Sequence, residues 1–118
     1  MNFRTVAAYI ILMLCMFVAG TAFSQNMCNS DICVVQFNAS WNESNSVDYL
    51  GKLTDCEVMN ISIDEGTYQS DYKIVVVPTI IVFNGKEVER FQANIMMQME
   101  ATRKDVQNAI DNIIYSDF

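Results

Sequence analysis

The sequence VPTIIVFNGKEVERF, residues 77–91, predicts two strands that lie side by side. Four of the five residues after Pro78 are apolar and four are β-branched, and the residues after the turn alternate between polar and apolar side chains, as strands do. Asn84-Gly85 joins the two runs and is a strong hairpin signal, because both residues tolerate positive φ. Pro78 precedes the first strand, where its missing N–H costs no ladder hydrogen bond. We therefore expect antiparallel strands at 79–83 and 86–91.

Two more strands and two short helices are expected before this hairpin. Residues 32–37 are apolar with one polar interruption, which indicates a buried strand. Residues 57–63 alternate between polar and apolar side chains and indicate a second strand. Short helices are expected at 46–53, where three apolar residues recur at three-residue steps, and at 65–73, where two tyrosines are four residues apart.

The final helix has the clearest signals. Thr102 and Asp105 form a pattern close to a capping box, with Asp in the place of Glu. An apolar stripe of helical period follows, formed by Val106, Ala109, Ile110, Ile113 and Ile114. The predicted order is β-α-β-α-β-β-α, and a right-handed crossover makes the first two strands parallel. We expect an α/β fold in which helices flank a four-stranded mixed sheet.

The first 24 residues predict a secretory signal peptide. Residues 1–4 carry one positive charge, residues 5–23 are nearly all apolar, and small side chains precede a cleavage site near Ser24-Gln25. The expected product is exported to the periplasm or outside the cell. The apolar run is also close to the length that spans a bilayer, so contact with a membrane is expected only if the leader is kept. The mature chain comprises an N-terminal tail, residues 25–31, and one domain, residues 32–118.

The mature part is acidic and contains no histidine. Without Arg4 it has six Lys or Arg against fourteen Asp or Glu, a net charge of −8. Nucleic acid binding requires clustered basic residues, so no nucleic acid partner is expected. The absence of histidine from the sequence excludes His-based catalytic triads and imidazole metal sites. The sequence has four glycines, one of them in the leader, which are too few for a phosphate-binding loop. We expect no metal and no cofactor.

Three cysteines follow the leader, namely Cys28, Cys33 and Cys56. An odd number in an oxidising compartment allows one internal disulfide and leaves one thiol, and the sequence does not choose among the three pairings. Cys33 and Cys56 border apolar stretches, so we expect small buried side chains and not reactive thiols. Cys28 lies in a short polar segment and is the cysteine expected to be most exposed. Four residues separate Cys28 from Cys33, which is not a zinc-site spacing.

Two stretches resemble the thioredoxin superfamily. Residues 35–41, VQFNASW, are similar to the first core strand of that family and to the tryptophan at its active site. Residues 77–85 are similar to its proline–threonine strand and the hairpin that follows. The resemblance covers about residues 32–114 and implies a minimal thioredoxin-like fold. It also implies a cis peptide bond between Val77 and Pro78.

The same resemblance indicates what this chain lacks. The family motif Trp-Cys-x-x-Cys corresponds to Trp41 and the four residues after it, with Asn42 and Asn45 at the two cysteine positions. Gln36 and Asn60 take the places of the family's buried acid and its lysine partner. Disulfide exchange needs an attacking thiolate and a second thiol that resolves the mixed disulfide, and a carboxamide can do neither. We therefore expect no catalytic residue at this position.

A peptide-binding groove is also implied by the resemblance. Family members hold extended substrates with the tryptophan, the residue before the cis-proline and the loop after the last strand, which correspond here to Trp41, Val77, Pro78 and Ala93. The backbone of Val77 would pair with a partner strand. The segment 95–99 lies next to this groove and contains three methionines. We expect these apolar residues to pack beneath the last helix. The alternative is that they form an adaptable binding surface.

Three functions agree with the sequence. The main hypothesis is an exported, non-catalytic protein of the thioredoxin family that binds an extended peptide or a partner protein in that groove. The alternative is a thiol–disulfide oxidoreductase, active in cell redox homeostasis, that uses Cys28, Cys33 or Cys56. A third is a structural module that is stapled by one disulfide or linked into a homodimer through Cys28.

Overall fold

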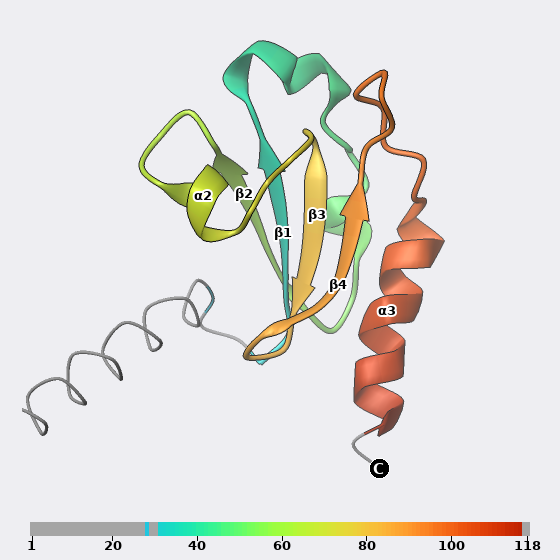
Figure 1. Cartoon of the computed structure of the whole chain (residues 1–118). Coiled ribbons are helices and arrows are strands. Elements are labelled where there is room, and N and C mark those ends of the chain that lie inside the picture. Colours follow the sequence, from blue (N-terminus) through green and yellow to red (C-terminus); the bar gives the residue numbers. More distant parts are fainter. Residues whose placement is uncertain (1–27, 29–30, 117–118) are drawn as a thin grey trace, which may run out of the picture.

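Four strands form one sheet in the structure, a computed structural model that describes Cys28 and residues 31–116. The strands are β1 (Cys33–Asn38), β2 (Glu57–Ser62), β3 (Thr79–Phe83) and β4 (Glu87–Gln92). Their order across the sheet is β2-β1-β3-β4, and β1 and β2 are parallel while the other two pairs are antiparallel (Figure 1). The predicted four-stranded mixed sheet is therefore confirmed.

The predicted leader, residues 1–24, lies outside the described residues, as do most residues of the predicted tail at 25–31. Export and cleavage near Ser24-Gln25 therefore stay predictions. Within the part of the chain that the structure describes, no helix has the length and apolar character needed to cross a bilayer.

The hairpin between β3 and β4 differs in detail from the two-residue turn that the sequence predicts. Gly85 has a φ of 79°, but Asn84 is not among the residues with positive φ. The register shifts between Val82 and Phe83, and Phe83 pairs with Glu87. The loop thus has three residues, and one glycine supplies the only left-handed conformation within it.

The helix expected at 46–53 is absent, and this prediction is wrong. One short 3₁₀ helix, η2 (Leu50–Lys52), lies within this region, and another, η1 (Ser40–Asn45), ends just before it. A side chain of β1 binds the backbone between the two 3₁₀ helices. Gln36 Oε1 accepts a hydrogen bond from the Val47 N–H at 2.8 Å. Asn and Ser side chains also compete with helical hydrogen bonds in such segments. The apolar residues that suggested a helix still reach the core through η2 and the residue after it, since Leu50 and Leu53 are buried.

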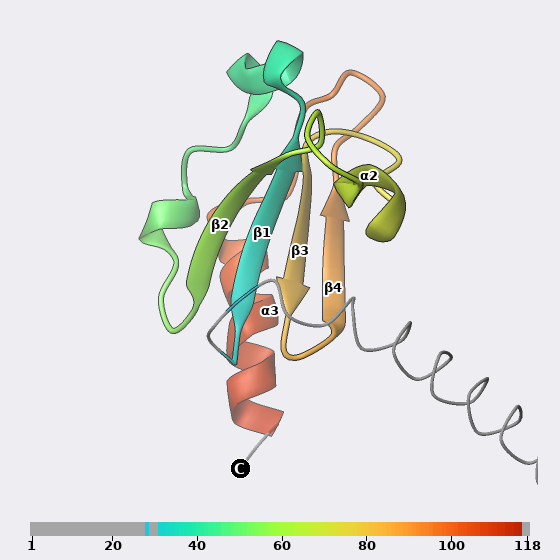
Figure 2. The same ribbon diagram turned by 90° about the vertical axis from the view of Figure 1, so that its left-hand side faces the viewer.

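Two helices cover opposite faces of the sheet (Figure 2). The longer, α3 (Arg103–Ser116), packs on the face that carries Val34, Ile80 and Val82. The predicted capping box is confirmed, because the Thr102 N–H donates to Asp105 Oδ2 at 2.8 Å and the Asp105 N–H donates to Thr102 Oγ1 at 3.3 Å. The buried stripe consists of Val106, Ala109, Ile110 and Ile113. Burial of each large aliphatic side chain stabilises the fold by about 1.5–3 kcal/mol.

The other face carries a smaller core beneath α2 (Tyr68–Asp71). This helix is shorter than the predicted 65–73, because residues with positive φ flank it, Gly66 at 63° and Lys73 at 53°. Tyr72 follows the helix, and its ring lies 5.2 Å from that of Phe37 and 5.8 Å from that of Phe83, centroid to centroid. The buried members of this second core are Cys33, Val35, Phe37, Ala39, Ile74, Val77 and Ile81.

The sheet has two ends with different chemistry. At one end Phe37 pairs with Thr79, directly after Pro78, and we name this the proline end. At the other end Cys33 pairs with both Phe83 and Glu57, and we name this the cysteine end. The six residues of β1 separate the two ends by roughly 16 Å, at about 3.3 Å per residue.

Candidate functional site

The proline end brings together most of the site residues that the sequence predicts. The Val77–Pro78 peptide bond is cis. The Pro78 carbonyl accepts a hydrogen bond from the Ala93 N–H at 3.1 Å. The Val77 carbonyl accepts one from Asn42 Nδ2 at 3.3 Å. Asn42 therefore stands directly beside the residue before the proline, although it lies 35 positions earlier in the chain.

Asn42 belongs to a buried network of amide side chains. Its Nδ2 also donates to Asn38 Oδ1 at 3.1 Å, and its Oδ1 accepts from Asn45 Nδ2 at 2.7 Å. Asn38 Nδ2 in turn donates to the Asn42 carbonyl at 3.0 Å and to Ser46 Oγ at 2.6 Å. No buried side-chain nitrogen or oxygen in the described ranges lacks a hydrogen-bond partner. Asn42 and Asn45, at the two expected cysteine positions, thus bond to each other and hold the loop in place. Neither side chain is a nucleophile.

A second amide pair lies behind this network on β1 and β2. Gln36 is 3% exposed, and its Nε2 donates to Asn60 Oδ1 at 2.9 Å across the parallel strand pair. Its Oε1 is occupied by the Val47 N–H. Neither side chain ionises, so this pair cannot accept or supply a proton in the physiological range. The pair holds the segment after η1 against the sheet and has no acid–base role.

Exposed apolar side chains surround the proline end, and we name them the apolar patch. Trp41 is 68% exposed, Val75 79%, Ile95 97%, Met96 69% and Met97 38%. The expectation that segment 95–99 packs beneath the last helix is therefore wrong for all but Met99, which is half-buried against the α3 core. Large apolar residues that gather on a surface often mark an interaction site. No local signal indicates the exposure of Val75, because it belongs to an apolar run that is typical of a core segment.

Three of the predicted groove residues support the patch from beneath and do not form its surface. Val77 and Ala93 are each 7% exposed, and Pro78 is fully buried. A cavity of about 210 Å³ opens between the two sides of the patch. Its lining includes Trp41 on one side and Ile95 and Met97 on the other, with Ile74, Val75 and Val77 between them.

Hydrogen bonds within the loop fix the second side of the patch. Asn94 Oδ1 accepts hydrogen bonds from the N–H groups of Met96 at 2.9 Å and Gln98 at 3.1 Å. The Asn94 N–H donates to the Gln98 carbonyl at 3.0 Å, and Met97 has a φ of 61°. This closed turn displays Ile95 and Met96 on a fixed backbone, so a partner would meet a surface that is already ordered.

The backbone before the proline has an unused donor. Among the described residues, nothing accepts a hydrogen bond from the Val77 N–H. This N–H lies in the segment between α2 and β3, next to the cavity of the apolar patch. A chain that ran past Val77 in an extended conformation could accept this hydrogen bond.

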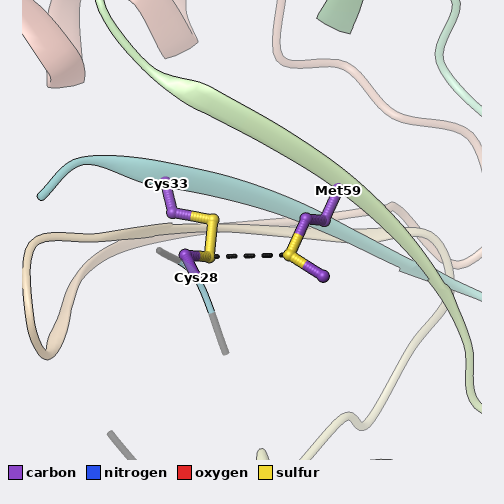
Figure 3. Close-up of a disulfide and its surroundings, with 3 residues drawn as sticks. All are labelled: Cys28, Cys33 and Met59. Atoms are coloured by element: carbon purple, nitrogen blue, oxygen red, sulfur yellow. Dashed lines mark hydrogen bonds between the residues drawn. A yellow bond between two sulfur atoms is a disulfide. The ribbon is translucent and has the colours of Figure 1, made fainter. Parts of the chain in front are cut away.

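The cysteines lie at the opposite end of the sheet. Cys28 and Cys33 form a disulfide with a Cα–Cα distance of 6.0 Å, which resolves the pairing that the sequence left open (Figure 3). Cys33 is 1% exposed, so its predicted burial is confirmed, but it is not a free thiol. Cys28 and Cys56 are both half-buried, and Cys33 is more buried than either.

Cys56 keeps its thiol and packs on the other face of the sheet. It contacts the α3 core, whereas the disulfide belongs to the core beneath α2. Burial, and then the neighbouring Asp55 carboxylate, raise the pKa of the Cys56 thiol. Its thiolate is therefore scarce at neutral pH, and the sheet separates it from the disulfide.

Comparison with known proteins finds likeness in solved structures alone. No family model and no curated protein matches this sequence. A point mutant of the thioredoxin from Halobacterium salinarum NRC-1 is 26% identical, with a TM-score of 0.54 over 71% of this chain and 75% of that one. Mitochondrial thioredoxin 3 from Saccharomyces cerevisiae is 15% identical, with a TM-score of 0.53 over 78% and 88%. Thioredoxin O2 from Arabidopsis thaliana is 17% identical, with a TM-score of 0.50 over 80% and 84%.

These likenesses agree with the sheet order and the helices, and the fold is thioredoxin-like. The two proteins below 25% identity support the fold only. Evidence for function therefore comes from this chain's own residues.

Proposed function

We propose that this protein is a non-catalytic thioredoxin-like module that binds an extended peptide or partner protein at the apolar patch, beside Val77 and Pro78. One observation carries the proposal. The position that would hold an attacking cysteine is filled by Asn42, which is 3% exposed and hydrogen-bonded to the Val77 carbonyl, while the surface around it is apolar and exposed.

Thiol–disulfide exchange at the proline end is disfavoured by the distance from that end to the nearest described cysteine. The disulfide lies at the cysteine end, roughly 16 Å away along β1. Thiol–disulfide exchange requires direct contact between an attacking thiolate and a disulfide sulfur. A substrate held against Val77 would therefore meet apolar side chains and amides, and no described thiol or disulfide.

Binding is supported by three features of the same surface. The free Val77 N–H suits the main chain of an added strand, which is how peptides extend sheets. Trp41 and the methionines offer large, adaptable contact areas. The hydrogen-bonded turn at Asn94 reduces the ordering cost that binding would otherwise carry. The expected ligand is an extended segment with apolar side chains at alternate positions.

The binding proposal is tested by selection from a displayed library of random peptides. We expect the protein to enrich apolar, extended sequences, and Trp41→Ala and Ile95→Ser to abolish their retention. Tyr115→Ala is the matched control, because Tyr115 is an exposed aromatic residue on α3, away from the patch. Equal loss of retention in Tyr115→Ala would place the binding surface elsewhere.

The non-catalytic part is tested by reduction of insulin with dithiothreitol. The purified protein is expected to leave the rate of insulin precipitation unchanged. Acceleration that persists in Trp41→Ala and disappears in Cys28→Ser would reject the proposal and favour the second candidate below.

A second candidate function is thiol–disulfide exchange at the Cys28–Cys33 disulfide. Its support is the disulfide itself, of which Cys28 is the less buried residue. In that reaction a client thiolate would attack Cys28, release the Cys33 thiolate and form a mixed disulfide. A reduction potential near that of cellular dithiol reductants, measured by equilibration with dithiothreitol, would favour this function. A much lower potential would mark a structural bridge.

We also propose that the chain is exported and cleaved near Ser24-Gln25. A disulfide agrees with an oxidising compartment. N-terminal sequencing of the mature protein tests the cleavage site. An intact leader found in the membrane fraction would show that the leader is kept as a membrane anchor and is not cleaved.

A further inference from the structure

Four potential metal ligands lie close together at the cysteine end. The sulfurs of Cys28 and Cys33 and a carboxylate oxygen of Glu57 all lie within 4.8 Å of one another. The Met59 thioether sulfur lies 3.7 Å from the Cys28 sulfur (Figure 3). A disulfide sulfur carries no hydrogen, so this is a close sulfur–sulfur contact and not a hydrogen bond in the oxidised protein.

We propose that reduction of the Cys28–Cys33 disulfide creates a site for one Cu(I) ion, held by the two thiolates and the Met59 thioether. The site lies at the opposite end of β1 from the apolar patch, and it does not depend on the binding function proposed above. The spacing of the cysteines alone does not indicate it, because the third sulfur comes from a different strand.

The fold places these donors on one face of two paired strands. Cys33 pairs with Glu57 in the parallel register of β1 and β2, and Met59 lies two residues further along β2. Residues two apart in a strand point to the same face. Met59 packs against the core that contains Cys33, as does Cys28. Two of the three sulfurs are therefore carried by the sheet, and only Cys28 comes from the segment before β1.

The donor set favours a soft ion. Thiolate and thioether sulfurs select Cu(I), whereas Mg²⁺ and Ca²⁺ require several oxygen ligands. One carboxylate is present in the cluster, and the sequence has no histidine to complete a common zinc set. Two sulfurs that share an ion at about 2.3 Å lie at most about 4.6 Å apart, and the Met59 sulfur lies 3.7 Å from the Cys28 sulfur.

The site exists only after a redox step. A dithiol reductant gives two electrons and two protons to the disulfide, so the sulfur–sulfur bond breaks, two thiols form and the reductant becomes a disulfide itself. Cu(I) then displaces the two thiol protons and stays in the +1 state. Reoxidation by a second disulfide, which takes up the two electrons and two protons and becomes two thiols, re-forms the Cys28–Cys33 bond, removes the two thiolate ligands and releases the ion.

Competition with bicinchoninate, a coloured Cu(I) chelator, tests the proposal. The protein reduced with an excess of dithiothreitol, then freed of it under anaerobic conditions, is expected to remove one equivalent of Cu(I) from the chelator. The same protein with its disulfide intact is expected to remove none. Copper-edge X-ray absorption of the loaded protein is expected to show three sulfur neighbours. Failure of the reduced protein to remove copper would overturn the proposal without need of any variant.

Substitutions identify the ligands. Cys28→Ser and Cys33→Ser are each expected to abolish copper uptake. Met59→Leu is expected to weaken the affinity for copper about tenfold, the lower end of the range typical when a residue that supports a metal site is replaced. Cys56→Ser and Met96→Leu are controls that leave uptake unchanged. Uptake that is lost in Cys56→Ser, or unchanged in Met59→Leu, would contradict this ligand set. Tighter binding of Zn²⁺ than of Cu(I), lost in Glu57→Gln, would overturn the assignment to copper.

Discussion

The two ends of β1 differ in the chemistry that a redox protein of this fold would combine. Among the described residues, the proline end has an exposed apolar surface and buried amides but no cysteine, and the cysteine end has all three cysteines but no comparable exposed surface. A strand of six residues keeps them apart. The surface proposed for binding and the cysteines thus lie at opposite ends of the sheet. Substitutions at each end measure how far the two ends depend on one another.

The largest expected effect comes from Phe37→Ala, which should damage both ends together. Phe37 is fully buried near the proline end of β1, one of the two central strands, and contacts Tyr72. Loss of a buried aromatic ring costs about 3–5 kcal/mol, which is a large part of a small domain's stability. Urea unfolding followed by circular dichroism measures this change. Loss of peptide retention with full stability would show that the two ends are not one cooperative unit.

A smaller effect is expected from Cys28→Ala, and it should be confined to the cysteine end. The disulfide closes a loop of six residues, and the chain-entropy relation gives about 2 kcal/mol for a loop of that size. The urea midpoint should fall accordingly, while peptide retention at the apolar patch stays unchanged. Cys56→Ala is the control for loss of a thiol. Weaker peptide retention in Cys28→Ala alone would mean that the two ends are coupled.

Asn38→Ala should produce the opposite pattern, at the proline end alone. The variant removes the donor to the Asn42 carbonyl and the acceptor for the Asn42 side chain. We expect a loss of about 1.5 kcal/mol, because one buried polar group keeps fewer partners. Peptide retention should weaken, while the disulfide keeps its reduction potential. Asn108→Ala, on the exposed side of α3, is the control.

The sequence predicted those parts of the fold whose signals are local. The capping residues Thr102 and Asp105 and the apolar stripe after them define α3 without reference to the rest of the chain. The region 46–53 could not be predicted in this way, because side chains of β1 decide its conformation through hydrogen bonds such as Gln36 to Val47. Contacts between distant segments are not visible in a local pattern.

Some residues of the candidate site were predictable from the sequence, and others were not. The resemblance identified Asn42, Val77 and Pro78, and the structure brings them together. The exposure of Val75 was not predictable, since an apolar run before a strand usually belongs to the core. Nor was the cysteine pairing, because three cysteines allow three bridges and only the path of the chain selects one.

The smallest expected effect concerns Asp64, which ties η1 to the chain after β2 at the proline end. Hydrogen bonds from the Ser40 side chain, then from the Ser40 N–H, lower the pKa of the exposed Asp64 carboxyl. A carboxyl whose pKa is lowered in the folded state contributes stability above its unfolded pKa, about 3.9, and loses it as the pH falls through the folded value. The contribution is therefore complete at neutral pH and should disappear below about pH 4.

Trp41 reports this change locally, because it follows Ser40 and is the single tryptophan of the chain. Its fluorescence should shift below about pH 4 in the wild-type protein, before circular dichroism detects unfolding. In Asp64→Asn the shift should be absent, since the amide does not titrate. Asp48→Asn, another exposed position near η1, should behave as the wild type. A fluorescence shift that persists in Asp64→Asn would assign the acid response to other groups, and the proline end would then be held by its amide network alone.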